Sequence, residues 1–263
     1  MAAYYNEIDP FAAAWLRELI ARGLIAAGDV DVRSISDVRP TDLAGYTQVH
    51  LFAGIGGWSY ALRLAVWPDA RPVWTGSCHC QPFSAAGRRK GTDDERHLWP
   101  EMHRLVAQCC PPIIFGEQVA GAAGRSWIDL VFADLDALDY ACGAADLCAA
   151  GVGAPHIRQR LYWVADAHCE GLDRGEKCDE RAQTRIAPPH RHHIDRRGCS
   201  AWAVAHAVEG ADNSWRVCPP GVQQMADGLS EGVGRLRGYG NAIVPQVAAT
   251  FITAAMQALE PGA

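Results

Sequence analysis

The chain has 263 residues, 49% of them hydrophobic, and a formal net charge of −6 at pH 7. A chain of this size and apolar content can bury one sizeable core and has room for a small second lobe. No apolar run approaches the roughly 18 residues of a membrane span, and the first residues do not form a signal peptide, so we expect a soluble cytoplasmic protein.

The cysteines and the basic residues add to this outline. Ten cysteines are scattered along the chain, and without an export signal we expect reduced thiols rather than disulfides. The net charge does not favour nucleic acid as a partner. However, residues 181–200 hold five arginines against one aspartate, with three histidines alongside. Such a basic patch can bind phosphates even on an acidic protein.

The N-terminal segment has the pattern of a strand followed by a helix. Residues 4–8 are β-prone, Asp9 is suited to cap a helix, and Pro10 suits its first position. A strand that ends in an acidic residue, here Glu7, often holds ribose hydroxyls in nucleotide-binding folds. A surface glutamate is an equally good interpretation of this segment alone. Residues 29–35 indicate a second strand and a loop.

A glycine-rich turn follows the next predicted strand, residues 48–52. Ala53-Gly54-Ile55-Gly56-Gly57 leads into a predicted helix over 58–66, with Trp58, Leu62 and Val66 on one side. Glycines at such a turn let the backbone approach a ligand closely, and the helix N-terminus faces that ligand. The pattern fits a dinucleotide-dependent enzyme as well as other nucleotide-type cofactors.

Cys80 lies where a short predicted strand around residues 72–74 gives way to a loop. Ligands of open α/β sheets are held at this carboxyl edge. A thiol next to Gln81 and Ser84, with Pro82 stiffening the loop, meets the needs of a positioned nucleophile. The alternative is a small buried cysteine in a turn.

The middle of the chain predicts further strands and helices. A helix from Glu95 to about Cys110 precedes a buried strand that ends in Glu117-Gln118-Val119, then a helix over 126–138 and a candidate strand over 139–148. Arg158 and Arg160 precede a strand over 161–165. Taken alone, Glu117 is compatible with a solvated strand end, and the two arginines with a solvated strand face.

The periodic pattern weakens from about 166 to 232 and returns in a C-terminal helix that begins near Pro245. The cysteines and histidines of the weak region lack paired CxxC spacing, so we expect no metal site.

Five segments resemble motifs of the C5-cytosine DNA methyltransferase family. These are the Cys80-Gln81 loop, the S-adenosylmethionine loop at 52–57, Glu117-Gln118-Val119, the segment 156–160 and Gly-Asn-Ala-Ile-Val-Pro at 240–245. Together they cover most of the chain outside 167–233. Three positions depart from the family pattern, which usually has Pro at His79, Asn at Gln118 and Gln at His156.

The order of the motifs also departs from the family. About two dozen residues separate Gly56 from Cys80, too few for the ribose-binding glutamate and the adenine-contacting segment that normally follow the glycine loop. The resemblance places both upstream, at Glu7-Ile8 and Ser34-Ile35, as in a circular permutation of the N-terminal part. The adenine-contacting aspartate of the family falls at Ser34, and Asp29 or Asp31 is a candidate substitute.

The resemblance implies a Rossmann-like, S-adenosylmethionine-dependent α/β sheet with helices on both faces and a small irregular target-recognition lobe. Residues 1–166 would form the catalytic and cofactor-binding domain, 167–233 the target-recognition region, and 234–263 a segment that returns to the catalytic domain. The implied activity is methylation of C5 of a cytosine flipped out of double-stranded DNA. We expect a monomer that is cytoplasmic, nucleoid-associated when bound to DNA, and has no membrane partner.

Residue roles carried over from the resemblance fall into three groups. The predicted catalytic residues are the nucleophile Cys80, the N3 proton donor Glu117, and Arg158 and Arg160, which steady the flipped base. The predicted cofactor-binding residues are Glu7, Ile8, Ser34, Ile35, Phe52, Ala53, Gly54, Ile55, Gly56, Gly57, Trp58, Asn241 and Ala242. The predicted substrate-binding residues are Gln81, Ser84, Gln118, Val119, Arg181, Arg185, Arg191, Arg196 and Arg197.

Three alternatives remain at this stage. A transfer-RNA cytosine methyltransferase of the same family would share every motif. A nicotinamide-dependent oxidoreductase explains the glycine loop and Glu7 but gives Cys80, Glu117 and Arg160 no reason to occur together. The departures at His79, Gln118 and His156 also fit a catalytically impaired DNA-binding relative.

Overall fold

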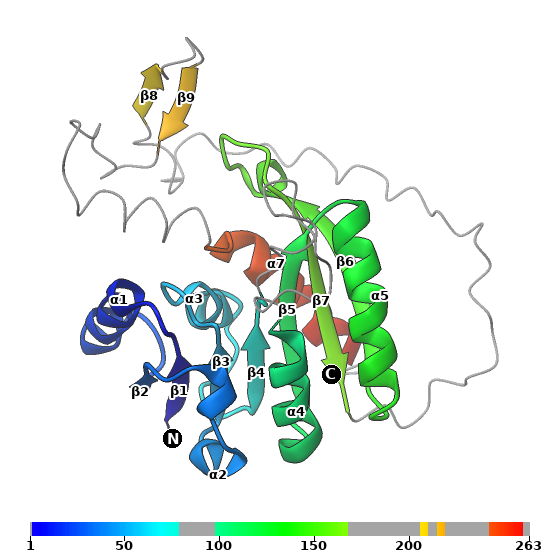
Figure 1. Ribbon diagram of the computed structural model, residues 1–263. Coiled ribbons are helices and arrows are strands. Elements are labelled where there is room, and N and C mark those ends of the chain that lie inside the picture. Colours follow the sequence, from blue (N-terminus) through cyan, green and yellow to red (C-terminus); the bar gives the residue numbers. More distant parts are fainter. Residues whose placement is uncertain (1, 79–97, 168–205, 210–214, 219–241, 260–263) are drawn as a thin grey trace, which may run out of the picture.

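A seven-stranded mixed sheet forms the centre of the protein (Figure 1). The computed structural model describes residues 2–78, 98–167, 206–209, 215–218 and 242–259. Within them the strands follow the spatial order β2-β1-β3-β4-β5-β7-β6. Their bounds are β1 Ala3–Asn6, β2 Gly28–Asp31, β3 Gln48–Leu51, β4 Val73–Gly76, β5 Ile113–Val119, β6 Ala141–Cys148 and β7 Gln159–Asp166.

The five strands from β2 to β5 are parallel, whereas β7 runs antiparallel to both β5 and β6. Every residue of β1, β3 and β4 is buried, as expected for parallel strands covered on both faces. The carboxyl ends of β2, β1 and β3 are in register, because Asn6 pairs with Asp31 on one side and with Leu51 on the other.

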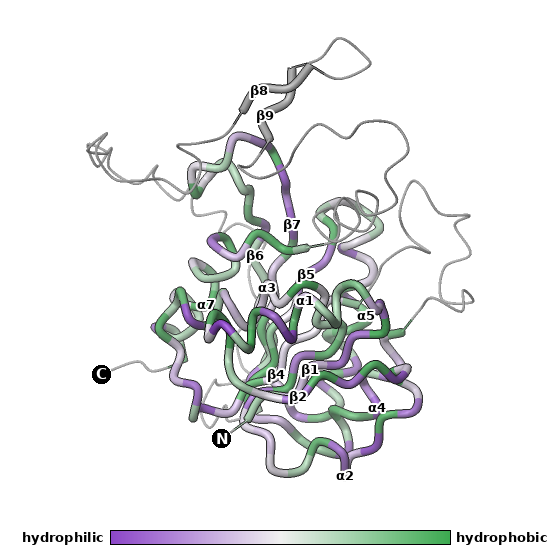
Figure 2. Tube along the Cα trace, turned by 90° about the vertical axis from the view of Figure 1, so that its left-hand side faces the viewer, coloured by the Kyte–Doolittle hydropathy of each residue, from purple (hydrophilic) through white to green (hydrophobic). Residues whose placement is uncertain are grey.

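Helices cover both faces of the sheet, as predicted. One face carries α1 (Pro10–Ala21), α3 (Gly57–Leu64) and α7 (Pro245–Leu259), whose apolar side chains form two neighbouring clusters with the strands. The other face carries α4 (Trp99–Cys109) and α5 (Ala122–Asp136), together with η1 (Ile35–Asp37) and α2 (Pro40–Leu43), which share one larger cluster. Hydrophobic residues predominate along α7 (Figure 2), which packs against α3.

The N-terminal helix α1 begins with the capping residue and the proline that the sequence predicted. Asp9 caps α1 by accepting hydrogen bonds from the backbone N–H groups of Phe11 and Ala12, and Pro10 occupies the first helical position. Gly23 follows the helix with φ of 66°, the left-handed conformation in which glycine is least strained.

Strand β5 ends at Val119, as predicted, and β7 pairs with it over its whole length. Two predicted details were wrong. Helix α5 begins at Ala122, four residues before the predicted start. Val66 does not share the buried side of α3: the helix ends at Leu64, Val66 has a positive φ and is 81% exposed.

Two short strands are described in the region predicted to recognise the target. β8 (His206–Glu209) and β9 (Trp215–Cys218) pair as an antiparallel two-stranded sheet. Among the described residues no helix combines the length and apolar character that a membrane crossing requires.

Candidate active site

The order in which the chain adds strands reverses between β1 and β3, so the ends of these two strands form a topological switch point. The chain leaves β1 toward β2 and leaves β3 toward β4, which lie on opposite sides. In open α/β sheets ligands bind at the carboxyl ends of strands that diverge in this way. Glu7 follows β1 at this edge, and the glycine-rich loop follows β3.

Glu7 is hydrogen-bonded to the glycine-rich loop although 47 residues separate it from Gly54. Its Oε2 accepts from Gly54 N–H at 2.7 Å, and its Oε1 accepts from Asp9 N–H at 2.8 Å. Two backbone donors therefore fix the orientation of this carboxylate at the ligand-binding edge. The adjacent Ile8 is 65% exposed. The displaced-glutamate hypothesis expects this neighbourhood of Glu7 and the loop.

The glycines of the loop serve different purposes. Gly54 has φ of 56°, and a Cβ added there would meet no described atom within 4 Å, so its side faces open space. A Cβ on Gly57 would lie 2.8 Å from Cγ1 of Ile243, because the segment before α7 packs directly on it. The open side at Gly54 and the fixed carboxylate of Glu7 fit a cofactor with ribose hydroxyls, whereas Gly57 is needed for packing.

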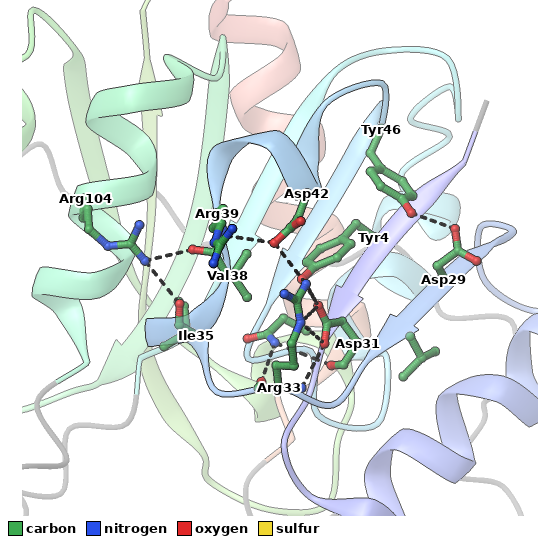
Figure 3. A network of polar contacts seen from close by, with 12 residues as sticks. Tyr4, Asp29, Asp31, Arg33, Ile35, Val38, Arg39, Asp42, Tyr46 and Arg104 are labelled. Atoms are coloured by element: carbon green, nitrogen blue, oxygen red, sulfur yellow. Dashed lines mark hydrogen bonds and ion pairs between the residues drawn. The ribbon is translucent and has the colours of Figure 1, made fainter.

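Two arginines hold the loop after β2, residues 33–38 (Figure 3). Nη2 of Arg33 lies 2.6 Å from Asp31 Oδ2 and 3.0 Å from Asp42 Oδ2, which ties β2 to α2. From α4, Arg104 Nη2 donates to the carbonyl oxygens of Ile35 and Val38. The loop is thereby clamped from two sides.

The two candidate substitutes for the adenine-contacting aspartate are both engaged within the protein. Asp29 accepts a hydrogen bond from Tyr46 Oη at 2.7 Å. Asp31 accepts from Tyr4 Oη and from Arg33, and although partial burial opposes the effect, these hydrogen bonds lower the pKa of Asp31 to about 2. These contacts therefore give no support to Asp29 or Asp31 as the residue that contacts adenine in place of the family's aspartate.

The two other residues of this loop predicted to bind the cofactor, Ile35 and Ser34, both have structural roles. Ile35 is buried in the cluster with α4 and α5, so most of its side chain is core. The hydroxyl of Ser34 caps η1 by accepting from Ser36 N–H.

A carboxyl–guanidinium pair occupies the facing strands β5 and β7. Arg160 Nε lies 2.8 Å from Glu117 Oε1. Glu117 pairs in register with Tyr162, so Arg160, two residues away, lies diagonally opposite on the same face of the sheet. Arg158 comes two residues earlier, and its Nη2 donates to Ala242 O at 2.9 Å. Two predicted catalytic arginines and a predicted cofactor-side residue are therefore brought together.

The Glu117 carboxyl is 9% exposed, and burial raises its pKa, while the charges of Arg160 and Arg158 oppose that rise. Burial disfavours the ionised form because the carboxylate loses its water shell. A carboxyl in this setting holds its proton at a higher pH than a solvated glutamate does. Such a group can donate a proton to a ring nitrogen.

The segment after β4 is anchored at the same edge. Trp58 Nε1 donates to Ser77 Oγ at 3.0 Å, and Gln118 Nε2 donates to Cys78 O at 3.5 Å. The Cys78 thiol is buried with its Sγ 3.8 Å from Met102 Sδ, and burial raises its pKa. Cys80, Gln81 and Ser84 lie outside the described residues, as do Asn241 and the five arginines between 181 and 197.

Sequence reasoning missed the residues that hold the site in place. Ser77, Arg33 and Arg104 were assigned no role, because each acts through a contact with a residue distant in sequence. A polar residue close to a predicted site residue, such as Ser77 three residues before Cys80, was the available signal.

Comparison with known proteins gives a match to a family model in the middle of the chain. A family model described as C-5 cytosine-specific DNA methylase matches residues 67–177. Two similar curated proteins are type II methyltransferases. M.AplI of Arthrospira platensis is 34% identical over 35% of this chain and 28% of its own length. M.NgoMIV of Neisseria gonorrhoeae is 36% identical over 37% of this chain and 32% of its own length. The aligned part spans about a third of these relatives.

Solved structures resemble the chain only loosely. The DNMT2 mutant of Spodoptera frugiperda matches 67% of this chain and 45% of its own with 16% identity and a TM-score of 0.44, and Entamoeba histolytica methyltransferase EhMeth matches 62% and 44% with the same identity and score.

The stretch matched by the family model includes both strands that join Glu117 to Arg160, and its sequence also contains Cys80. The two curated relatives are named as methyltransferases, and the methyl donor of C-5 cytosine methyltransferases is S-adenosylmethionine. Residues 67–177 of this chain are therefore similar to the C-5 cytosine-specific DNA methylase family.

Proposed function

We propose that this protein is a DNA (cytosine-5)-methyltransferase that works through a covalent bond between Cys80 and C6 of a flipped cytosine. The observation that carries the proposal is the buried Glu117 carboxyl with its raised pKa, paired to Arg160 at 2.8 Å. A carboxyl whose pKa is raised by burial and that lies next to a cation is suited to a base whose ring nitrogen gains electron density.

The first step uses only groups of this chain. Cytosine C5 is a poor nucleophile, so the Cys80 thiolate adds to C6 and forms a carbon–sulfur bond. The electron pair of the C5–C6 double bond shifts through the ring toward N3, which takes the proton of Glu117. Arg160 stabilises the carboxylate left on Glu117 and steadies the base. The ring is now an enamine with a nucleophilic C5.

The cofactor would be held at the edge between β1 and β3. Glu7 would accept hydrogen bonds from its ribose hydroxyls, and the backbone at Gly54 would lie next to it. When bound, S-adenosylmethionine supplies the methyl group that C5 takes up. Loss of the C5 proton to a base then re-forms the C5–C6 double bond and expels the Cys80 thiolate, and N3 returns its proton to the Glu117 carboxylate.

The properties of Cys78 support Cys80 as the nucleophile. Cys78 is the other cysteine of this segment, but its thiol is buried against Met102 and its pKa is raised. A thiol that resists ionisation is a poor nucleophile, because only the thiolate attacks carbon. The substrate must also reach the group, and Cys78 is 4% exposed.

Double-stranded DNA is the proposed substrate, and the family description supports DNA over transfer RNA. The target cytosine must be flipped out of the duplex, at a cost of a few kcal/mol of lost stacking. Residues 167–233 would recognise the sequence, with their arginines on phosphates and in the groove.

The direct test is methyl transfer from radiolabelled S-adenosylmethionine to unmethylated DNA and, in parallel, to transfer-RNA transcripts. We expect label in DNA, at cytosines that bisulfite sequencing then locates, and none with Cys80→Ala. Label in transfer RNA alone would replace the DNA proposal with the transfer-RNA alternative. A wild-type protein that binds DNA but labels neither would be a catalytically impaired relative.

A further inference from the structure

The side chain of Trp58 contacts three parts of the candidate site. Trp58 belongs to the first turn of α3, directly after the glycine-rich loop. Its indole Nε1 donates to Ser77 Oγ at 3.0 Å. Ser77 follows β4 and precedes Cys80 by three residues. The hydrogen bond thus connects the helix at the cofactor edge with the segment that leads to the proposed nucleophile.

The same indole ring packs against two aromatic residues of the strands that carry the carboxyl–guanidinium pair. Trp58 stacks on Phe115 with 6.2 Å between ring centroids and meets Tyr162 edge-on at 6.0 Å. Phe115 lies two residues before Glu117 on β5, and Tyr162 two residues after Arg160 on β7. Because side chains alternate between the faces of a strand, both rings share the face of the catalytic pair.

The segment after β4 has a second anchor from the catalytic strand. Gln118, next to Glu117, donates from Nε2 to Cys78 O at 3.5 Å. Its own Oε1 accepts from Val119 N–H at 2.9 Å, which fixes the direction of the amide. Ser77 and Cys78 are therefore held from the cofactor side by Trp58 and from the catalytic side by Gln118.

We propose that Trp58 is a positioning residue whose hydrogen bond to Ser77 sets the distance between the nucleophile segment and the cofactor loop. This inference rests on the proposed function, since it concerns how two reacting groups of that reaction are aligned. A misplacement of about 1 Å between reacting groups slows a reaction strongly. A hydrogen bond between the two segments that carry these groups should therefore affect the methylation rate more than it affects cofactor binding.

A second buried tryptophan shows what a purely structural indole does here. Trp67 also lies in this cluster, meets Phe115 edge-on at 5.7 Å, and donates from Nε1 to Arg71 O at 3.1 Å. Its acceptor is four residues away in its own loop. Both indoles satisfy the need of a buried N–H group for an acceptor, but the acceptor of Trp58 is Ser77, 19 residues away and three residues before Cys80 in the sequence.

The experiment compares Ser77→Ala, Trp58→Phe and the double variant with Trp67→Phe as the matched control. Phenylalanine keeps an aromatic ring but removes the donor. Three quantities are measured in the full-length protein: S-adenosylhomocysteine affinity by calorimetry, single-turnover methylation rate, and amide hydrogen exchange of the peptide that contains Ser77 and Cys78. Ser77→Thr keeps the hydroxyl and serves as the rescue.

We expect Ser77→Ala and Trp58→Phe each to slow single-turnover methylation about three- to tenfold, the range of one net hydrogen bond. The double variant should be no slower than the slower single variant, because both remove the same bond. Ser77→Ala should keep wild-type cofactor affinity, Ser77→Thr should regain most of the rate, and Trp67→Phe should leave the rate unchanged. Amide exchange should accelerate in Ser77→Ala and Trp58→Phe.

A wild-type rate in Ser77→Ala, or single effects that multiply in the double variant, would overturn the inference while leaving the proposed function in place. A wild-type protein that methylates no cytosine would instead overturn the proposed function. Amide exchange then decides the positioning role by itself: unchanged exchange in both variants rejects it, because the exchange does not depend on activity.

Discussion

Arg160 Nε and Glu117 Oε1 lie 2.8 Å apart across two antiparallel strands, diagonally on one face of the sheet. The contact joins a carboxyl whose pKa burial raises to a cation that opposes the rise. Burial thus favours the protonated carboxyl, and the guanidinium of Arg160 stabilises the carboxylate that remains after proton transfer. The pair is therefore matched to proton donation in the catalytic step.

Replacing Glu117 by Gln removes the proton donor without removing the side-chain volume. We expect single-turnover methylation to fall by about a hundredfold, the lower range of general acid catalysis. The wild-type rate should rise with pH as Cys80 ionises and fall again as Glu117 loses its proton. The falling limb should be absent from the Glu117→Gln profile. A variant that keeps both limbs would move the proton donor elsewhere, and Glu18→Gln is the exposed control.

The raised pKa of Glu117 also predicts a pH-dependent stability. The folded protein keeps this proton above the ordinary value of 4.5, so stability is full below that value and is lost as pH rises through the folded-state pKa. Glu117→Gln cannot lose a proton. In urea unfolding at pH 5 and pH 8, the wild type should therefore lose more stability than the variant does. An equal loss in both proteins would contradict the raised pKa.

Cys80→Ala should abolish methyl transfer while leaving cofactor binding largely intact, because the thiolate enters only the chemical step. DNA containing 5-fluorocytosine should form a covalent adduct with the wild type and none with the variant. Cys78→Ala should still form the adduct, although it removes packing against Met102. An adduct that persists in Cys80→Ala and disappears in Cys78→Ala would exchange the two roles.

Glu7→Ala should weaken S-adenosylhomocysteine binding by roughly 1.5–3 kcal/mol, the range of hydrogen bonds to a charged group. The structure adds a second effect, since the same carboxylate accepts from Gly54 N–H and Asp9 N–H. Calorimetry gives the affinity directly. Glu18→Ala, which removes an exposed carboxylate paired to Arg22 on α1, should change nothing. Unchanged affinity in a folded Glu7→Ala would remove the displaced-glutamate hypothesis.

Gly57→Ala should destabilise the protein by about 1–3 kcal/mol, the usual cost of overpacking. The new Cβ would lie 2.8 Å from Ile243 Cγ1 and push the segment before α7 off the loop. Thermal unfolding measures the loss. Gly151→Ala meets no described atom within 4 Å and should be close to neutral. A Gly57→Ala protein as stable as the wild type would show that this segment is not packed on α3 in solution.

The arginines of residues 167–233 should contribute affinity for DNA without taking part in the chemistry. Replacing all five by alanine, namely Arg181, Arg185, Arg191, Arg196 and Arg197, should lower DNA affinity and flatten its dependence on salt, because fewer counterions are released. Cofactor affinity should be retained. An unaltered salt slope would assign recognition to the catalytic lobe.

Much of the fold was predictable because short-range signals specify it. The cap at Asp9 and the glycine turn at 53–57 both act within a few residues, and each was found where the sequence placed it. The pairing partner of β5 was not predictable in this way, because β7 comes more than forty residues later in the chain.

The candidate site was predictable in its residue types but not in its supports. Glu117 and Arg160 could be proposed from the family motifs, and their contact required the register of two strands. Asp31 was considered for the cofactor because the sequence gives no sign that Arg33 and Tyr4 bind it. The hydrogen bond from Trp58 to Ser77 likewise joins positions with no periodic relation.

The apolar cluster beneath the cofactor edge has a consequence for how the protein is synthesised. Its buried members, Ala3, Tyr5, Leu16, Ile25, Ala26 and Ala53, all come from the first 53 residues. Chains fold N-terminal parts first as they leave the ribosome. Glu7 and the glycine-rich loop at 53–57, which its carboxylate contacts, are therefore both synthesised before the first residue of strand β5, so this contact can form before β5 exists.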